Sequence, residues 1–155
     1  MLLALIVWIG GIIFFAFVEA PTLFSVLPST RMAGDVVSVS LTRLHWMGLI
    51  SGVVFLICSL VYNWQKYVQL KPFAASHILV ALMLVLTAYS QFGITPRMRE
   101  IRARIESMSN PSIPWDDKAF TEFSREHQLS TWTEGTILIL GIGVVGLTAR
   151  RNGSS

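Results

Sequence analysis

The sequence is poor in charged residues and has a single cysteine, Cys58. Charged residues make up 14% of the chain, against roughly 25% in soluble globular proteins, so the composition is that of a membrane protein. One cysteine excludes an internal disulfide and a Cys-x-x-Cys metal motif, and its place in an apolar stretch indicates a packing residue. The 12 Lys and Arg outnumber the nine Asp and Glu, but arginines beside membrane spans contact lipid headgroups, so we expect no nucleic-acid partner.

Long apolar stretches make up much of the chain. They predict four membrane spans, at about residues 2–18, 46–62, 73–94 and 133–149, since a spanning helix needs about 20 apolar residues. No basic segment precedes the first stretch, which favours a retained span over a cleaved signal peptide. The sequence therefore predicts an all-α fold, an integral membrane four-helix bundle, as a single membrane domain over residues 1–155.

The connections between the spans differ in character. Residues 20–43 contain two prolines and a glycine, which predicts a loop with some helix near its end. The third connection holds most of the charge. Its apolar spacing and acidic start signals predict amphipathic extramembrane helices at about 97–108 and 116–131.

Four spans place both termini on one side of the membrane. That side carries four of the 12 Lys and Arg, and the side of the first and third loops carries eight. Because cytoplasmic loops are enriched in these residues, the count favours a cytoplasmic location for the first and third loops.

Several ionisable and polar residues converge at the end of the bundle that carries these two loops. The main candidates are Glu19 at the end of span one, His45 at the start of span two, and His127, Ser130 and Glu134 at the entry to span four. Span three adds the secondary candidates Tyr89, Gln91 and Arg97. A carboxylate near hydrocarbon costs about 2.5–3.5 kcal/mol on insertion scales, so a cluster of this kind is a site hypothesis.

The chemistry of this cluster leaves alternatives open. Two histidines and two carboxylates suit a divalent metal, and His45 with His127 would suit the axial positions of a haem-type tetrapyrrole. Glu–His pairs that only tie helices together are the structural alternative. A transporter would need a polar path, and spans one and two have no ionisable residue in mid-membrane. No nucleophile–base pair or cofactor fingerprint is present, so an enzyme is the least favoured class.

Three segments resemble a known family: "GGIIFFAFVEAPTLFSVLP" (10–28), "ITPRMREIR" (94–102) and "FSREHQLSTW" (123–132). They are similar to the signatures of the transmembrane-protein-205 family, a four-helix membrane domain of unknown function. The residues that carry the match are Pro21, Phe24, Pro96, His127 and Ser130. Glu134 occupies a position where the family commonly has Asn. The layout is more loosely similar to copper-resistance-D type membrane proteins. We expect a multi-pass integral membrane protein, located in the bacterial inner membrane.

The leading hypothesis is a small integral membrane protein with a polar His/Glu site at one end of the bundle. This site would bind a metal ion or small ligand, or the protein would act as an accessory subunit of a membrane complex. A purely structural or assembly module is the first alternative, and a small-solute or proton-coupled transporter the second. The expected partners are the lipid bilayer and other membrane proteins or a second copy of this chain.

Overall fold

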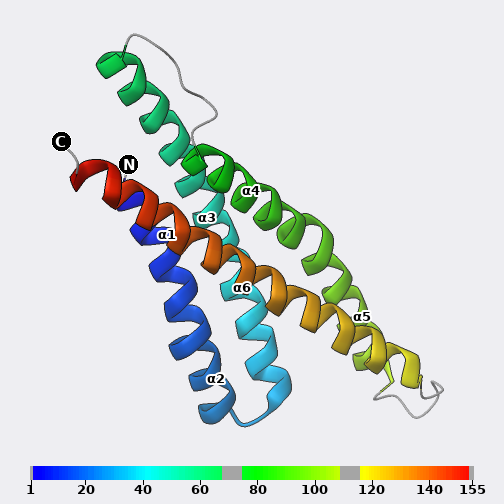
Figure 1. The fold of residues 1–155 in the computed structure, drawn as a ribbon. Helices are drawn as coiled ribbons and strands as arrows, with labels where there is room; N and C mark the ends of the chain where they lie inside the picture. The colour runs from blue at the N-terminus through cyan, green and yellow to red at the C-terminus, as the bar shows by residue number, and fades with distance from the viewer. Residues whose placement is uncertain (1, 68–74, 109–115, 154–155) are drawn as a thin grey trace.

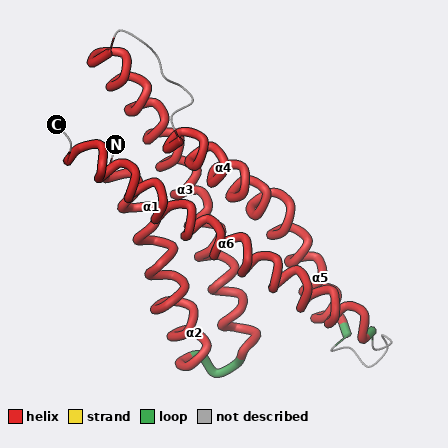
Figure 2. The backbone as a smooth tube through the Cα atoms, in the orientation of Figure 1, coloured by secondary structure: helices red, strands yellow, loops and turns green. Residues whose placement is uncertain are grey.

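The computed structural model describes residues 2–67, 75–108 and 116–153, and every regular element among them is a helix (Figures 1 and 2). Two elements, η1 and η2, are short π-helices. The elements in chain order are α1 (Leu2–Phe14), η1 (Phe15–Glu19), α2 (Ala20–Val26), α3 (Thr30–Tyr67), α4 (Ala75–Tyr89), η2 (Ser90–Ile94), α5 (Thr95–Ser107) and α6 (Asp117–Gly153). This architecture confirms the predicted all-α bundle.

Within the described residues, four segments are long and apolar enough to cross a membrane, which confirms the number of spans expected from the sequence. They are Leu3–Val26, Thr30–Val61, Ala75–Ser107 and Asp117–Ala149. The start of α1 and the end of α6 lie together at one end of the bundle, and the ends of α2 and α5 lie toward the opposite end (Figure 1). The chain is thus a multi-pass membrane protein.

The segment at 20–43, expected to be a loop, is almost entirely helical. α2 continues to Val26 and α3 begins at Thr30, so one short turn separates the two helices. The hydroxyl of Ser29 caps the start of α3, because its Oγ accepts a hydrogen bond from the backbone N–H of Met32 at 3.2 Å. The prediction of a long loop was wrong because Pro21 lies in the first turn of α2, where a helix tolerates proline, and the Ser29 cap starts α3 directly after Pro28.

α6 combines the amphipathic helix expected at 116–131 and the span expected at 133–149 into one helix. Asp116 stabilises its first turn, where Oδ1 accepts the backbone N–H of Lys118 at 3.0 Å. α5 covers most of the amphipathic segment expected at 97–108 and follows η2 without a break. Helices therefore extend from the apolar spans into the charged half of the molecule.

Each π-helix ends two residues before a proline, Pro21 after η1 and Pro96 after η2. A proline inside a helix lacks the N–H, and its ring crowds the carbonyl four residues earlier. The wider π-turn accommodates it. In η2 the N–H of Thr95 donates to the carbonyl of Ser90, five residues back.

The apolar core is centred on Trp8, which is 1% exposed. Gly48 and Gly52 of α3 make room for its indole. A Cβ added at Gly48 would lie 2.8 Å from Cε2 of Trp8, and one at Gly52 would lie 2.7 Å from Cζ3. Residues from all four spans complete this core: Leu5, Ile9, Ile12, Leu44, Phe55, Val80, Met83, Ile137 and Val144.

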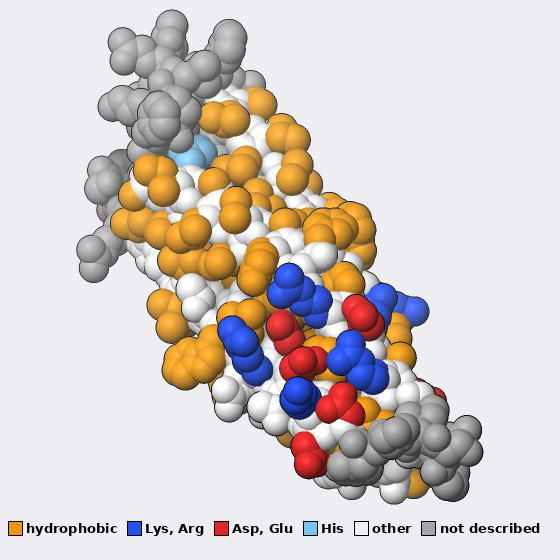
Figure 3. Space-filling model, turned by 90° about the vertical axis from the view of Figure 1, so that its right-hand side faces the viewer, with side chains coloured by type: hydrophobic (Ala, Val, Ile, Leu, Met, Phe, Trp, Pro, Cys, Tyr) orange, Lys and Arg blue, Asp and Glu red, His pale blue; other side chains and the backbone are white. Residues whose placement is uncertain are grey.

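The surface divides into an apolar half and a charged half (Figure 3). Large apolar side chains are exposed along the spans, with Leu3 73% and Ile139 71% accessible, as contact with lipid tails requires. Ion pairs join α3, α5 and α6 in the charged half, among them Arg102–Asp35 at 3.0 Å. The candidate site lies near the junction of the two halves.

Candidate functional site

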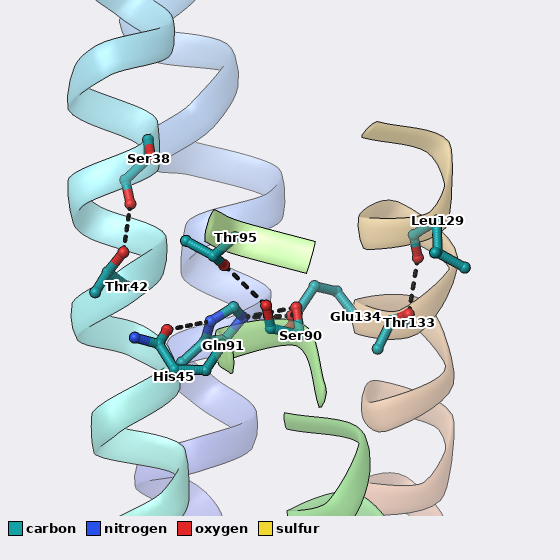
Figure 4. Close-up of polar contacts among 9 residues, drawn as sticks. All are labelled: Ser38, Thr42, His45, Ser90, Gln91, Thr95, Leu129, Thr133 and Glu134. Atoms are coloured by element: carbon teal, nitrogen blue, oxygen red, sulfur yellow. Dashed lines mark hydrogen bonds and ion pairs between the residues drawn. The ribbon is translucent and has the colours of Figure 1, made fainter. Parts of the chain in front are cut away.

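His45 is a buried histidine on α3, directly before the apolar run that begins at Trp46. Its side chain is 1% exposed and lies between η2 and α6 (Figure 4). Nε2 lies 2.6 Å from Oε1 of Glu134, and Nδ1 lies 2.9 Å from Oε1 of Gln91. One imidazole thus connects three segments that are far apart in the sequence.

Both atoms that face the His45 ring nitrogens are oxygens. Oxygen acceptors on both sides require both ring nitrogens to carry a proton, which is the imidazolium form. Exchange of the amide oxygen and nitrogen of Gln91 would fit a neutral ring that carries its proton on Nε2. In either form Nε2–H donates to the carboxylate of Glu134, so this contact forms in both protonation states.

Ser90 completes the cluster from η2. Its Oγ donates to Oε1 of Glu134 at 3.3 Å and lies 3.3 Å from Nε2 of His45. The hydroxyl of Thr95 donates to the carbonyl oxygen of Ser90 at 2.9 Å, across the same π-turn (Figure 4). The π-helix before Pro96 therefore carries two of the three side chains that contact the imidazole. We call His45, Ser90, Gln91 and Glu134 the His45 cluster.

A cavity of about 560 Å³ lies next to the His45 cluster, on its charged side, between α2, α3, α5 and α6. Small-molecule sites typically enclose about 300–1,000 Å³. Two of its lining residues border the cluster: Thr95, which bonds Ser90, and Ser130, one helical turn before Glu134. The remaining lining combines apolar and charged side chains, among them Phe24, Leu41, Met98, Arg99, Arg102 and Phe123. We call this space the interhelical pocket.

The predicted stripe on α6 divides between the two features. Glu134 reaches His45, whereas His127 and Ser130 line the interhelical pocket. A helix rises 1.5 Å per residue, so His127 lies about 10 Å along the axis from Glu134. Its ring stacks with Phe123 at a centroid distance of 6.2 Å. The residues share one face of α6 but occupy different depths.

Three predicted residues lie outside both the His45 cluster and the interhelical pocket. Glu19 is half-buried at the end of η1 and makes no hydrogen bond or ion pair with other described residues. Tyr89 is 49% exposed, and its ring lies beside Gly93. Arg97 is exposed and pairs with Glu126 at 3.9 Å. The expected meeting of Glu19 with the histidines does not occur.

The metal hypothesis has no assembled ligand set in the part of the chain that the structure describes. No group of three or more His, Cys, Asp or Glu side chains is placed there to hold an ion. His45 and Glu134 supply two donors, but these bond each other. The four-ligand set expected from Glu19, His45, His127 and Glu134 does not form among these residues.

Sequence reasoning missed Ser90 and the role of Thr95. Pro96, which lies inside a helical pattern, could have indicated them, because a proline there predicts a local departure from the regular helix. On α5, Arg99 and Arg102 were interpreted only as residues that contact lipid headgroups and set the topology, and Arg97 was the one arginine named as a site candidate. Arg99 and Arg102 instead line the interhelical pocket.

Residues 3–107 match the family described as Domain of unknown function (DUF4149). The chain belongs to this family. The DUF4149 match covers more than half of the 155 residues; it includes His45 and Gln91, and Glu134 lies beyond it. No curated protein and no solved structure matches the chain. The DUF4149 assignment agrees with a membrane domain of unknown function, and it does not carry the transmembrane-protein-205 or copper-resistance-D names.

Proposed function

We propose that this protein binds a small amphiphilic molecule in the interhelical pocket, with the His45 cluster at the inner end of the site. The pocket itself is the observation that carries the proposal. Its volume of about 560 Å³ suits a small molecule, and its lining places apolar side chains beside cationic ones. A molecule with a polar head and an apolar body matches both kinds of lining.

The polar residues at the inner end support this role. Ser130 is 7% exposed and Thr95 is 8% exposed, and both line the pocket. Through Ser90, Thr95 connects the pocket wall to the His45–Glu134 pair. A ligand group that bonds the Thr95 hydroxyl would therefore act on the Ser90 backbone, which carries Oγ to the buried pair.

Native mass spectrometry of protein extracted from its membrane in mild detergent tests the proposal. We expect an adduct of small-molecule mass on the wild-type protein. Ser38→Trp should remove this adduct, because Ser38 lines the pocket and an indole would fill part of its volume. Ser124→Trp is the matched control, since Ser124 is exposed on α6 and is not part of the lining.

Equal helical content in far-ultraviolet circular dichroism would show that both tryptophan variants fold. An adduct that persists in a folded Ser38→Trp protein, or a wild-type protein with no adduct, would contradict pocket binding.

A helix-locking role is the second candidate, and the saturation of the His45 cluster favours it. Both ring nitrogens of His45 and one oxygen of Glu134 are already bonded within the protein. In that case Ser38→Trp would change no bound mass, and substitutions in the cluster would alter only the stability of the bundle. Elemental analysis of the purified protein tests the remaining metal hypothesis directly, with about one ion per chain as the supporting result.

A further inference from the structure

The interhelical pocket has more cationic than anionic side chains. Arg31 of α3 and Arg99 and Arg102 of α5 line it, and Glu106 is the one carboxylate in its described lining. Arg31 pairs with Glu106. Arg102 pairs with Asp35, which is not part of the lining, so an anion in the pocket would meet the guanidinium of Arg99 and the N–H groups of Arg102 that do not bond Asp35.

Arg99 has no carboxylate partner among the described residues. Its Nη2 donates to the hydroxyl of Thr42 at 2.8 Å, a neutral acceptor. A hydroxyl leaves the guanidinium charge uncompensated and the other N–H groups available. Arg99 is thus the side chain of the pocket best prepared to receive an anionic group.

Arg102 is held in position by contacts on several sides. Nη1 donates to Oδ1 of Asp35 at 3.0 Å, and Cζ lies 5.6 Å from the centroid of the Phe123 ring. Gly34 leaves the space for this guanidinium, because a Cβ there would lie 3.0 Å from Nη2 of Arg102. A group fixed before binding loses less conformational entropy when the ligand arrives.

The level of the pocket in the bundle indicates where the anion comes from. Phe24 lines the pocket and lies near the end of the apolar segment Leu3–Val26, and the pocket arginines of α5 follow the apolar part of their own segment, an arrangement that fits the depth of the bilayer surface. Phospholipid headgroups occupy this depth, and basic pockets between spanning helices bind them. The apolar wall, with Met98 and Ile105 on α5, would take the start of an acyl chain.

We propose that the interhelical pocket binds the phosphate headgroup of an anionic phospholipid from the surrounding bilayer, with Arg99 and Arg102 as its main ligands. The two arginines are three residues apart on α5 and share one helix face. This inference rests on the proposed function and names the ligand class. The expected cytoplasmic location of the same end agrees with it, since that leaflet is rich in anionic lipids.

The test uses two photoreactive probes in nanodiscs of neutral phosphatidylcholine. One is a phosphatidate with a diazirine in its acyl chain, and the other is the diacylglycerol with identical chains, which lacks the phosphate. After irradiation, peptide mass spectrometry locates the labelled residues. We expect the phosphatidate to label pocket residues such as Met98 and Phe123 about tenfold more strongly than the diacylglycerol, because a charge-assisted hydrogen bond to the phosphate strengthens binding by about a factor of ten.

Single variants identify the groups that bind the phosphate. Arg99→Gln should reduce phosphatidate labelling of the pocket by about tenfold, and Arg99→Lys should retain part of it. Arg43→Gln is the matched control, since Arg43 is exposed on α3 and does not line the pocket. Arg99 has no ion pair among the described residues, so its substitution leaves the salt bridges of the charged half in place.

The possible failures are distinguishable. Equal labelling of the pocket by both probes would overturn the anionic headgroup and leave pocket binding intact. Displacement of the phosphatidate by millimolar inorganic phosphate would overturn the lipid source in favour of a soluble anion. Labelling confined to the outer faces of the spans, together with a wild-type protein free of adduct, would remove both this inference and the proposed function.

Discussion

Nε2 of His45 lies 2.6 Å from Oε1 of Glu134, although the two residues are 89 positions apart in the chain. The contact connects α3 to α6 at the level where the apolar half of the bundle meets the charged half. The histidine is 1% exposed and the glutamate 15% exposed, so water competes little for their hydrogen bond. A buried pair of this kind stabilises a particular arrangement of helices, because each partner left alone is costly.

Removal of the carboxylate should therefore destabilise the bundle. We expect Glu134→Leu to lower the free energy of unfolding by about 3–5 kcal/mol, the usual effect of breaking a buried pair. Glu134→Gln keeps an oxygen acceptor for Nε2–H and should cost about 1 kcal/mol. Titration of the detergent-solubilised protein with dodecyl sulfate, followed by circular dichroism, measures both.

Glu122→Gln is the control for this prediction. Glu122 pairs with Arg104 at 3.4 Å in an exposed position, and such pairs contribute about 0–1 kcal/mol. If Glu134→Leu were as stable as Glu122→Gln, the His45 cluster would not hold α3 and α6 together.

The π-helix η2 gives a second prediction, because it carries Ser90 and Gln91 to His45. Pro96→Ala restores the backbone N–H and removes the ring, so the segment can return to a regular helix. Conversion of the π-turn to an α-turn rotates the preceding helix by about 100°, the angle of one residue, relative to the following one. We expect the hydrogen bonds from η2 to His45 to weaken, with a change in the 15N resonances of its ring.

Pro21→Ala is the matched substitution after the other π-helix. η1 supplies no member of the His45 cluster, so the His45 resonances should be unchanged in this variant. Equal spectral changes in the two proline variants would show that the imidazole responds to the bundle as a whole and not to η2.

The contact between α1 and α3 gives a third prediction. Gly48→Ala places a methyl group 2.8 Å from Cε2 of the buried Trp8, and such overpacking costs about 1–3 kcal/mol. Gly10→Ala meets nothing within 4 Å, so the better helix propensity of alanine should stabilise the protein by up to about 1 kcal/mol. Thermal unfolding measures both variants. A lower unfolding temperature for Gly48→Ala together with a higher one for Gly10→Ala would support this packing, and a lower one for Gly10→Ala would contradict it.

The sequence predicted the number of spans because a membrane imposes long uncharged runs, and these remain legible without an alignment. It also placed His45 and Glu134 at the same end of the bundle. Successive spans run in opposite directions, so the starts of spans two and four lie on the same side of the membrane. The loop at 20–43 was predicted wrongly, because the Ser29 cap starts α3 at Thr30, and Gly34 is kept inside that helix where its missing Cβ leaves space for Arg102. Short-range signals of this kind are weaker than the apolar runs.

The order of the spans does not predict which side chains form hydrogen bonds in the site. Apolar runs locate a side chain to within one or two helical turns, whereas a hydrogen bond requires a separation of about 3 Å. Glu19 and His127 were therefore grouped with His45 although neither bonds to it. Ser90 and Gln91 reach the imidazole through a π-helix, whose extra residue changes the phase of the helix wheel from which a sequence is interpreted.

The lipid exposure of the spans gives a fourth prediction, and Cys58 is its probe. Cys58 is exposed on α3 within the apolar run, so in a bilayer it faces hydrocarbon. A charged reagent does not enter hydrocarbon, because transfer of an ion out of water is costly. We expect a charged methanethiosulfonate to modify Cys58 at least about tenfold more slowly in nanodiscs than in the unfolded protein.

Ser124→Cys, which adds a thiol on the exposed charged part of α6, should react at the rate of the unfolded chain in the same nanodiscs. Nanodiscs leave both membrane surfaces open to the reagent, so the orientation of the protein in the bilayer does not affect the rate. Rapid modification of Cys58 would therefore place the apolar run of α3 outside the bilayer.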